Sequence, residues 1–173
     1  MDDTTRTQPP RAADPVALTY AFHVFSRETL IRKLDGLSDA DQRRAVLPSG
    51  TSMLGLFKHC IHVERLWIAY AMGGLDPETL WTAEELNDDD EDADWKVGPD
   101  ESFESLVALA NAEAVRSDAI IPRLRWEEIG KSPRCVAQGL TVGWVLSHLV
   151  WEVGRHLGQM DVMRELTDGA TGE

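Results

Sequence analysis

Cysteine is scarce in this sequence, and its scarcity excludes two classes of site. The 173 residues include two cysteines, Cys60 and Cys135, with no Cys-x-x-Cys spacing. Disulfide frameworks and thiolate zinc knuckles need more cysteines at closer intervals. We therefore expect both thiols to be reduced, and neither is placed as an obvious catalytic nucleophile.

Long hydrophobic runs are also missing. No uncharged apolar stretch approaches the roughly 20 residues that a membrane-spanning helix needs. The first ten residues lack the hydrophobic core of a secretory signal peptide. These two absences predict a cytoplasmic protein.

Positive charge is outnumbered, with 17 lysine and arginine residues against 30 aspartate and glutamate residues and a net charge of -13 at pH 7. A chain of this charge without a basic stripe is repelled by nucleic-acid phosphates and anionic membranes, so neither is an expected partner. Much of the acidity lies in residues 88–94. This segment fails as a calcium-binding EF-hand loop, because Ala93 stands where the motif needs glycine and Pro99 where it needs the closing glutamate. We interpret it as a solvated acidic loop.

The apolar residues that are present follow helical spacing. With 43% hydrophobic residues, the chain can form one core, and we expect a single domain over residues 14–173 after a flexible segment, 1–13. Capping residues and glycine or proline stops delimit four long predicted helices: Asp14 to Gly36, Ser52 to about Met72, Ser102 to Pro122, and Thr141 to about Thr167. The pattern predicts an all-α protein, an up-down four-helix bundle with a long acidic connection, residues 75–99, between the second and third helices.

Polar side chains lie on or beside the stripes that should face the core. At about 100° per residue, His59 falls in the middle of the apolar face of the second helix. In the last helix, His156 lies within the buried stripe, and Glu152 lies on its margin one turn away. Residues at i and i+4 have Cβ atoms about 5 to 6 Å apart, which lets a carboxylate and an imidazole bind one ion. His62 falls at the edge of its stripe, and His148 is turned outward, where it can remain hydrated or stack on an indole.

These positions allow two interpretations. A divalent metal could be bound by His59, Glu152 and His156 with one coordination position left open. Alternatively, the histidines could be hydrogen-bonded core residues, and Glu152 could pair with Arg155 or with another arginine. Burying a carboxylate without compensation is costly, so Glu152 needs a partner under either interpretation.

Three parts of the sequence, in this order, resemble a known family. They are residues 34–38 (LDGLS), residues 48–59 (PSGTSMLGLFKH) with 62–67 (HVERLW), and residues 155–161 (RHLGQMD) leading to 168–173 (DGATGE). Through them the chain resembles, over nearly its whole length, the DinB-like metal-binding four-helix bundles, and specifically the branch of mycothiol-dependent transferases.

The resemblance implies a site and a chemistry. In such proteins a histidine near the start of the second helix and an i, i+4 pair on the fourth bind a divalent metal, often zinc or nickel. These positions correspond to His59, Glu152 and His156. Gln159 stands where close relatives often carry histidine, a departure that leaves the three ligands in place but could alter the pocket wall.

The implied partners are a low-molecular-weight thiol, such as mycothiol, and an electrophilic small molecule. A dication favours thiolate over thiol and so creates a nucleophile without an internal cysteine. A homodimer is consistent with this kind of bundle. The leading hypothesis is therefore a metal-dependent thiol S-transferase.

Two alternatives to the transferase remain. One is a metal-dependent hydrolase, in which the open position carries a water molecule of lowered pKa. The other is a non-catalytic bundle that binds a metal or ligand in a stress response. Gln159, His62 or the connection 75–99 could contact the reacting partner, and none of them is assigned as a catalytic acid or base.

Overall fold

The computed structural model describes residues 8–86, 90 and 92–172, and this part of the chain contains helices and no strand. The elements are α1 (Pro15–Leu34), α2 (Asp39–Arg43), α3 (Met53–Glu64), η2 (Arg65–Met72), α4 (Pro77–Leu80), α5 (Ala83–Leu86), η3 (Ala93–Trp95), α6 (Phe103–Ile120), η4 (Ile121–Arg123), α7 (Pro133–Gln138) and α8 (Val142–Asp168). The all-α class is as predicted. Residues 1–7 lie outside the described part, so the predicted flexibility of residues 1–13 and the single domain over 14–173 stay predictions.

The long helices begin where the sequence places capping residues. The side chains of Asp14, Ser52, Ser102 and Thr141 each accept a hydrogen bond from a backbone N–H group in the first turn of α1, α3, α6 and α8. Gly169 follows α8 in the left-handed conformation, with φ of 78°, and ends that helix. The local chemistry of the chain therefore fixes the lengths of the segments that carry the candidate ligands.

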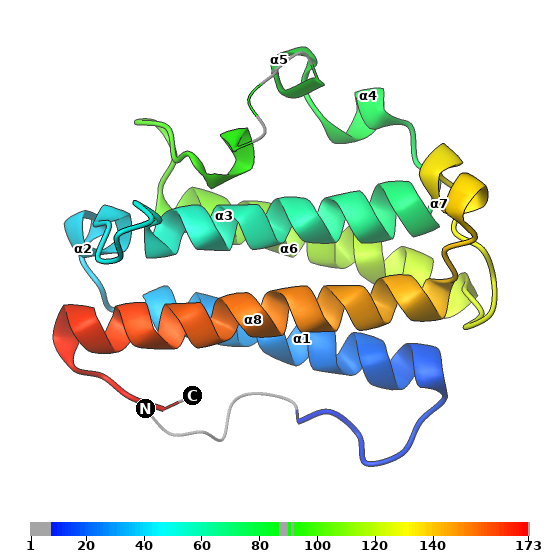
Figure 1. The fold of residues 1–173 in the computed structure, drawn as a ribbon, viewed down its shortest axis with the longest axis horizontal. Coiled ribbons are helices and arrows are strands. Elements are labelled where there is room, and N and C mark those ends of the chain that lie inside the picture. Colours follow the sequence, from blue (N-terminus) through cyan, green and yellow to red (C-terminus); the bar gives the residue numbers. More distant parts are fainter. Residues whose placement is uncertain (1–7, 87–89, 91, 173) are drawn as a thin grey trace.

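Two pairs of long helices run in opposite directions: α1 and α8 run one way, and α3 and α6 run the other (Figure 1). The rings of Phe57 and Phe103, near the beginnings of α3 and α6, have centroids 6.2 Å apart. Lys33, near the end of α1, lies 2.6 Å from Asp161, near the end of α8. The connection between residues 73 and 102 returns the chain along the bundle, so α6 runs parallel to α3, and the predicted up-down order of the four long helices is not confirmed (Figure 1).

Three apolar residues that helical spacing places on the core-facing stripes, Leu66, Val115 and Ala119, are not buried. Leu66 is 38% exposed, because the chain continues from α3 into the π-helical η2, whose wider turns shift the phase of the stripe. Val115 and Ala119 of α6 are also exposed. The buried stripe of that helix runs instead through two apolar and two polar residues: Leu106, Ala110, Glu113 and Ser117.

The long connection packs against the beginning of α3. A Cβ atom at Gly55 would lie 2.4 Å from the carbonyl oxygen of Trp95, so a residue without a side chain is needed where η3 crosses the helix. This close approach places Trp95 and its neighbour Asp94 beside α3, one turn after Gly55, at His59.

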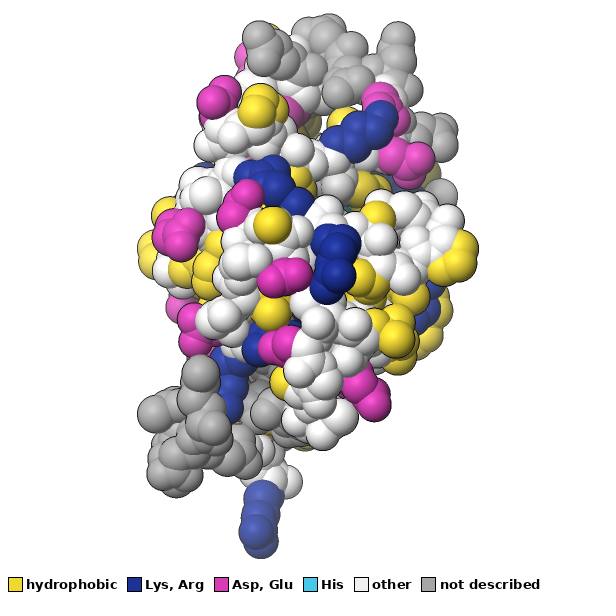
Figure 2. All heavy atoms as spheres, turned by 90° about the vertical axis from the view of Figure 1, so that its left-hand side faces the viewer, with side chains coloured by type: hydrophobic (Ala, Val, Ile, Leu, Met, Phe, Trp, Pro, Cys, Tyr) yellow, Lys and Arg dark blue, Asp and Glu magenta, His cyan; other side chains and the backbone are white. Residues whose placement is uncertain are grey.

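Charged side chains are interspersed at the end of the bundle formed by α2 and the last turns of α1 and α8. Figure 2 shows acidic and basic side chains alternating over this face. Arg43 pairs with Asp39 at 2.8 Å, and Arg164 pairs with Asp168 at 2.9 Å. Pairs of this kind lie at the surface and contribute little to stability.

Among the described residues, no helix is both long and apolar enough to cross a membrane.

A buried ion-pair network joins α1, α3 and α6. Glu64 Oε1 accepts hydrogen bonds from Arg27 of α1 and from the Ser117 hydroxyl of α6, both at 2.7 Å, and its Oε2 lies 3.0 Å from His23 Nε2. Burial alone would raise the pKa of Glu64, but His23, Arg27 and Ser117 together lower it to about 2. Glu64 is therefore ionised in the core and holds three helices together.

We predict that Glu64→Gln destabilises the fold by about 3 kcal/mol, since it leaves Arg27 and His23 without their buried partner. Because the pKa of Glu64 is depressed in the folded state, its contribution is complete above its ordinary pKa and is lost as the pH falls toward 2. Urea unfolding between pH 6 and pH 2.5 should therefore show a smaller loss of stability in the variant than in the wild type. Glu104→Gln, at an exposed position of α6, is the matched control. Equal pH dependence in Glu64→Gln and the wild type would contradict the assignment.

Candidate metal centre

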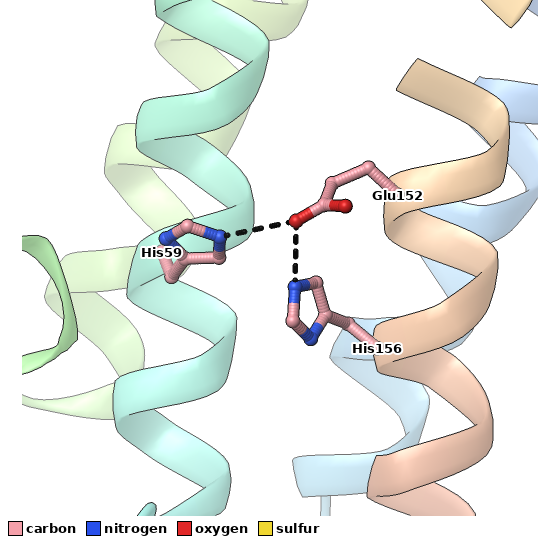
Figure 3. Close-up of side chains that lie close together, drawn as sticks. All are labelled: His59, Glu152 and His156. Carbon is pink, nitrogen blue, oxygen red and sulfur yellow. Dashed lines mark hydrogen bonds and ion pairs between the residues drawn. The ribbon is translucent and has the colours of Figure 1, made fainter. Parts of the chain in front are cut away.

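The three predicted ligands converge between α3 and α8. His59 projects from α3, and Glu152 and His156 project from successive turns of α8 (Figure 3). Glu152 Oε1 lies 3.0 Å from His156 Nε2 and 3.7 Å from His59 Nε2. One ligand atom from each residue lies within 4.8 Å of the other two. The prediction that these side chains share one interior is therefore confirmed in geometry.

The far nitrogen of each imidazole has a polar partner. His59 Nδ1 lies 2.7 Å from Asp94 Oδ2, and His156 Nδ1 lies 3.3 Å from Gln159 Oε1. A carboxylate oxygen accepts hydrogen bonds, so Asp94 fixes the proton of His59 on Nδ1 and leaves the Nε2 lone pair free. The amide oxygen of Gln159 accepts from the Nδ1–H group of His156 in the same way, which leaves Nε2 as the nitrogen that faces Glu152. Asp94 and Gln159 thus orient both Nε2 atoms toward Glu152, in the way that hydrogen-bond partners orient the histidines of metal sites.

Trp95 closes one side of the cluster. Its ring stacks on His59 with centroids 3.9 Å apart and an interplanar angle of 15°, and it meets His156 edge-on at 5.2 Å. His59 Nε2 is buried and has no hydrogen-bond partner among the described residues. An unsatisfied, buried lone pair aimed at a carboxylate is costly unless a further group binds there.

Glu152 is the charged member of the cluster. Its side chain is 16% exposed. Burial alone would raise the pKa of Glu152, but its hydrogen bond with His156 and the charges of His156 and Arg155 keep that pKa below the ordinary value. The carboxylate is therefore ionised at neutral pH and available as a ligand.

The alternative pairing of Glu152 with Arg155 is present as well. Arg155 Nη2 donates to Glu152 Oε1 at 3.3 Å, and the arginine side chain is 57% exposed. A long contact to a solvated guanidinium offsets little of the cost of burial. It therefore does not explain why two histidine nitrogens face the same carboxylate oxygen.

A cleft of about 520 Å³ lies between α3 with η2 and the connection that carries α4, α5 and η3. His59, His62 and Leu66 line it on the helical side, and Trp81, Glu85 and Asp94 line it on the other. Of the three cluster residues, His59 alone lines this cleft, so the cleft meets the cluster at the His59 imidazole.

The remaining histidines and Cys60 lie in other environments. His148 stacks on Trp144 with ring centroids 5.0 Å apart, which is one of the two arrangements predicted for it. It is not part of the cluster. His62 lines the cleft, half-buried at the edge of the stripe as predicted. Burial raises the pKa of the Cys60 thiol, so this cysteine is an inert core residue.

Sequence reasoning missed Asp94. It belongs to the acidic segment 88–94, for which the sequence predicts a solvated loop, and residues 88, 89 and 91 lie outside the described part of the chain. The indoles of Trp81 and Trp95 do indicate from the sequence that the connection is partly packed against the domain, and Asp94 lies next to Trp95. Two imidazoles and one carboxylate, with their far nitrogens held, form a donor set that suits a borderline dication such as zinc or nickel.

Comparison with known proteins identifies a family for this chain. A family model described as mycothiol-S-transferase matches residues 20–169, which include all of α3, η2 and α6, all of α8, and most of α1. A comparison with curated proteins finds no significant match. Because the family match covers most of the chain, including the cluster and the cleft, the chain belongs to the mycothiol-S-transferase family.

Proposed function

We propose that this protein is a metal-dependent S-transferase that activates a low-molecular-weight thiol, mycothiol, for attack on an electrophilic small molecule. The observation that carries the proposal is the convergence of His59, Glu152 and His156, whose ligand atoms lie within 4.8 Å of one another. The family match supports mycothiol as the thiol.

The cluster residues would hold the metal, and zinc or nickel suits their donor atoms. A bound dication supplies the charge that favours thiolate over thiol at neutral pH. The buried, unsatisfied Nε2 of His59 supports this assignment, since a cation would satisfy it. Asp94 and Gln159 keep both imidazoles in the tautomer that binds, and Trp95 restricts access to the His59 side of the cluster.

The cleft that begins at His59 would hold the electrophile. Its walls include the apolar side chains of Val63, Leu66 and Trp81. The carboxylates of Glu85 and Asp94 also face it. These carboxylates repel anions, so uncharged or cationic electrophiles with an apolar part fit best. A homodimer and a cytoplasmic location stay predictions.

We predict that His59→Ala, Glu152→Ala and His156→Ala each lose most metal content, because each removes one of three ligands. Metal should be measured by mass spectrometry after purification and by titration of the metal-free proteins with zinc and with nickel. His148→Ala is the matched control, since that histidine lies on α8 outside the cluster. Variants that fold normally by circular dichroism and keep full metal content would contradict the site.

Asp94→Asn should weaken metal binding by about 10- to 100-fold, because the amide no longer fixes the tautomer of His59 as a carboxylate does. Titration of the metal-free variant with zinc measures this loss. Asp100→Asn changes an exposed carboxylate of the same connection and should bind zinc like the wild type. Equal affinity in both variants would show that the Asp94 contact does not support the site.

Turnover should require the metal and the thiol together. The zinc-loaded protein is mixed with mycothiol and 1-chloro-2,4-dinitrobenzene, and the thioether product is quantified by mass spectrometry. A chelator should abolish the reaction, and added zinc or nickel should restore it. Ester or amide hydrolysis in thiol-free buffer, without thioether formation, would instead favour a hydrolase. A protein that takes up neither metal would favour a non-catalytic bundle.

A further inference from the structure

We infer that His62 is the general base that accepts the thiol proton, a role that rests on the proposed S-transferase function. His62 lies three residues after His59 on the same helix, and both side chains line the cleft. Residues at i and i+3 are neighbours on a helix surface, with Cβ atoms about 5 to 6 Å apart. A sulfur atom that enters the cluster from the cleft therefore passes within reach of the His62 imidazole, directly or through one water molecule.

The ring of His62 has no polar or aromatic partner in the described part of the chain, unlike the rings of the other histidines near it. Among the described residues, it makes no hydrogen bond, ion pair or ring contact. By contrast, both nitrogens of His156 face partners, and His59 is held by Asp94 and Trp95. His62 is half-buried, so its ring is shielded but still open to the cleft. A free imidazole in that position has both nitrogens available for proton transfer.

The charged neighbours of His62 are themselves engaged. Lys58 donates to Glu101 at 2.9 Å, and Arg65 donates to Glu113 at 2.9 Å. Glu85 accepts a hydrogen bond from the backbone N–H of Thr82 at 2.7 Å. Lys58 and Arg65 have no free lone pair, and a carboxylate such as Glu85 is a weaker base than an imidazole, so His62 is the better proton acceptor among them.

The same surroundings keep His62 in its basic form. Burial lowers its pKa first, and the positive charges of Arg65 and Lys58 lower it further, while the carboxylates of Glu85 and Asp94 oppose them. Asp90 and His59 also line the cleft beside it. With a pKa below the ordinary value, the imidazole is unprotonated at neutral pH and can accept a proton.

The thiol first gives its proton to His62, and its sulfur then displaces a leaving group from the electrophile. The S–H bond of the thiol breaks, its proton passes to a ring nitrogen of His62, and the electron pair stays on sulfur. That pair forms the new S–C bond with 1-chloro-2,4-dinitrobenzene while the C–Cl bond breaks and chloride leaves with its electron pair. The imidazolium of His62 then releases its proton to water, which restores the base.

The test compares His62→Gln with His148→Gln, a change of the other half-buried histidine outside the cluster. All three proteins are loaded with zinc, and their zinc affinities are expected to agree, because His62 is not a ligand. In the assay with mycothiol and 1-chloro-2,4-dinitrobenzene, His62→Gln should lower kcat/KM by about 100-fold at neutral pH. Its rate should keep rising with pH above the point where the wild type and His148→Gln have levelled off.

A second readout counts protons without turnover. Calorimetric titration with mycothiol, in two buffers of different ionisation enthalpy at neutral pH, measures the protons released to solution. The wild type should release fewer protons per bound thiol than His62→Gln, because the thiolate bound beside His62 raises the pKa of the imidazole in the complex, and His62 then keeps the proton. A His62→Ala variant, which opens space in the cleft, should regain activity when imidazole is added.

The outcomes separate this inference from the function on which it rests. A wild-type protein without mycothiol-dependent turnover overturns the proposed function and this inference together. Turnover in the wild type, with the same pH profile and proton release in His62→Gln, overturns the role of His62 alone. Loss of activity in His62→Gln with reduced zinc affinity, or without rescue of His62→Ala by imidazole, also overturns it and indicates a structural role.

Discussion

The buried carboxylate of Glu64 is the interaction on which the position of α3 depends. It binds α1 through Arg27 and α6 through Ser117, and it lies five residues after His59 on a continuous helix. α1 in turn packs along α8 over much of its length (Figure 1). Both α3 and α8 therefore contact α1, which helps to fix their positions relative to each other. The distance between His59 and His156 is therefore set by contacts outside the cluster. An ionised group in the core costs desolvation energy, and here that cost is offset by partners on two other helices.

The helical part of the molecule could be predicted because its signals are local. Asp14, Ser52, Ser102 and Thr141 mark the helix starts, and a period of about 3.6 residues places His59 and His156 on inward faces and Glu152 at the margin of one. The parallel direction of α6 and α3 is not a local property. It follows from how the connection packs on α3, which no periodicity records.

Contacts that come from outside the helices could not be predicted in the same way. Asp94 reaches His59 because η3 crosses α3 at Gly55, and in the sequence it is one acid among several. The π-helical turns of η2 turn Leu66 outward into the cleft, although an α-helical phase places it inside. In both cases a tertiary contact or a change of helix type decides the side chain's direction, and a fixed angle per residue does not contain that information.

The connection therefore contributes residues to the site and also covers it. Asp94 holds the proton of His59, and Trp95 stacks on the same ring, so a movement of η3 would change both the tautomer and the packing of one ligand. His156 is held differently, by Gln159 on its own helix. The two sides of the cluster are thus held by different elements: His156 by its own helix, and His59 by the segment that lines the cleft. Of the three cluster residues, His59 would be the first to contact a molecule bound in the cleft beside Trp81 and Asp94. Cys60 and Cys135 are both buried, so under the proposed function the nucleophile would arrive from solution, and the cleft would lead it to His59.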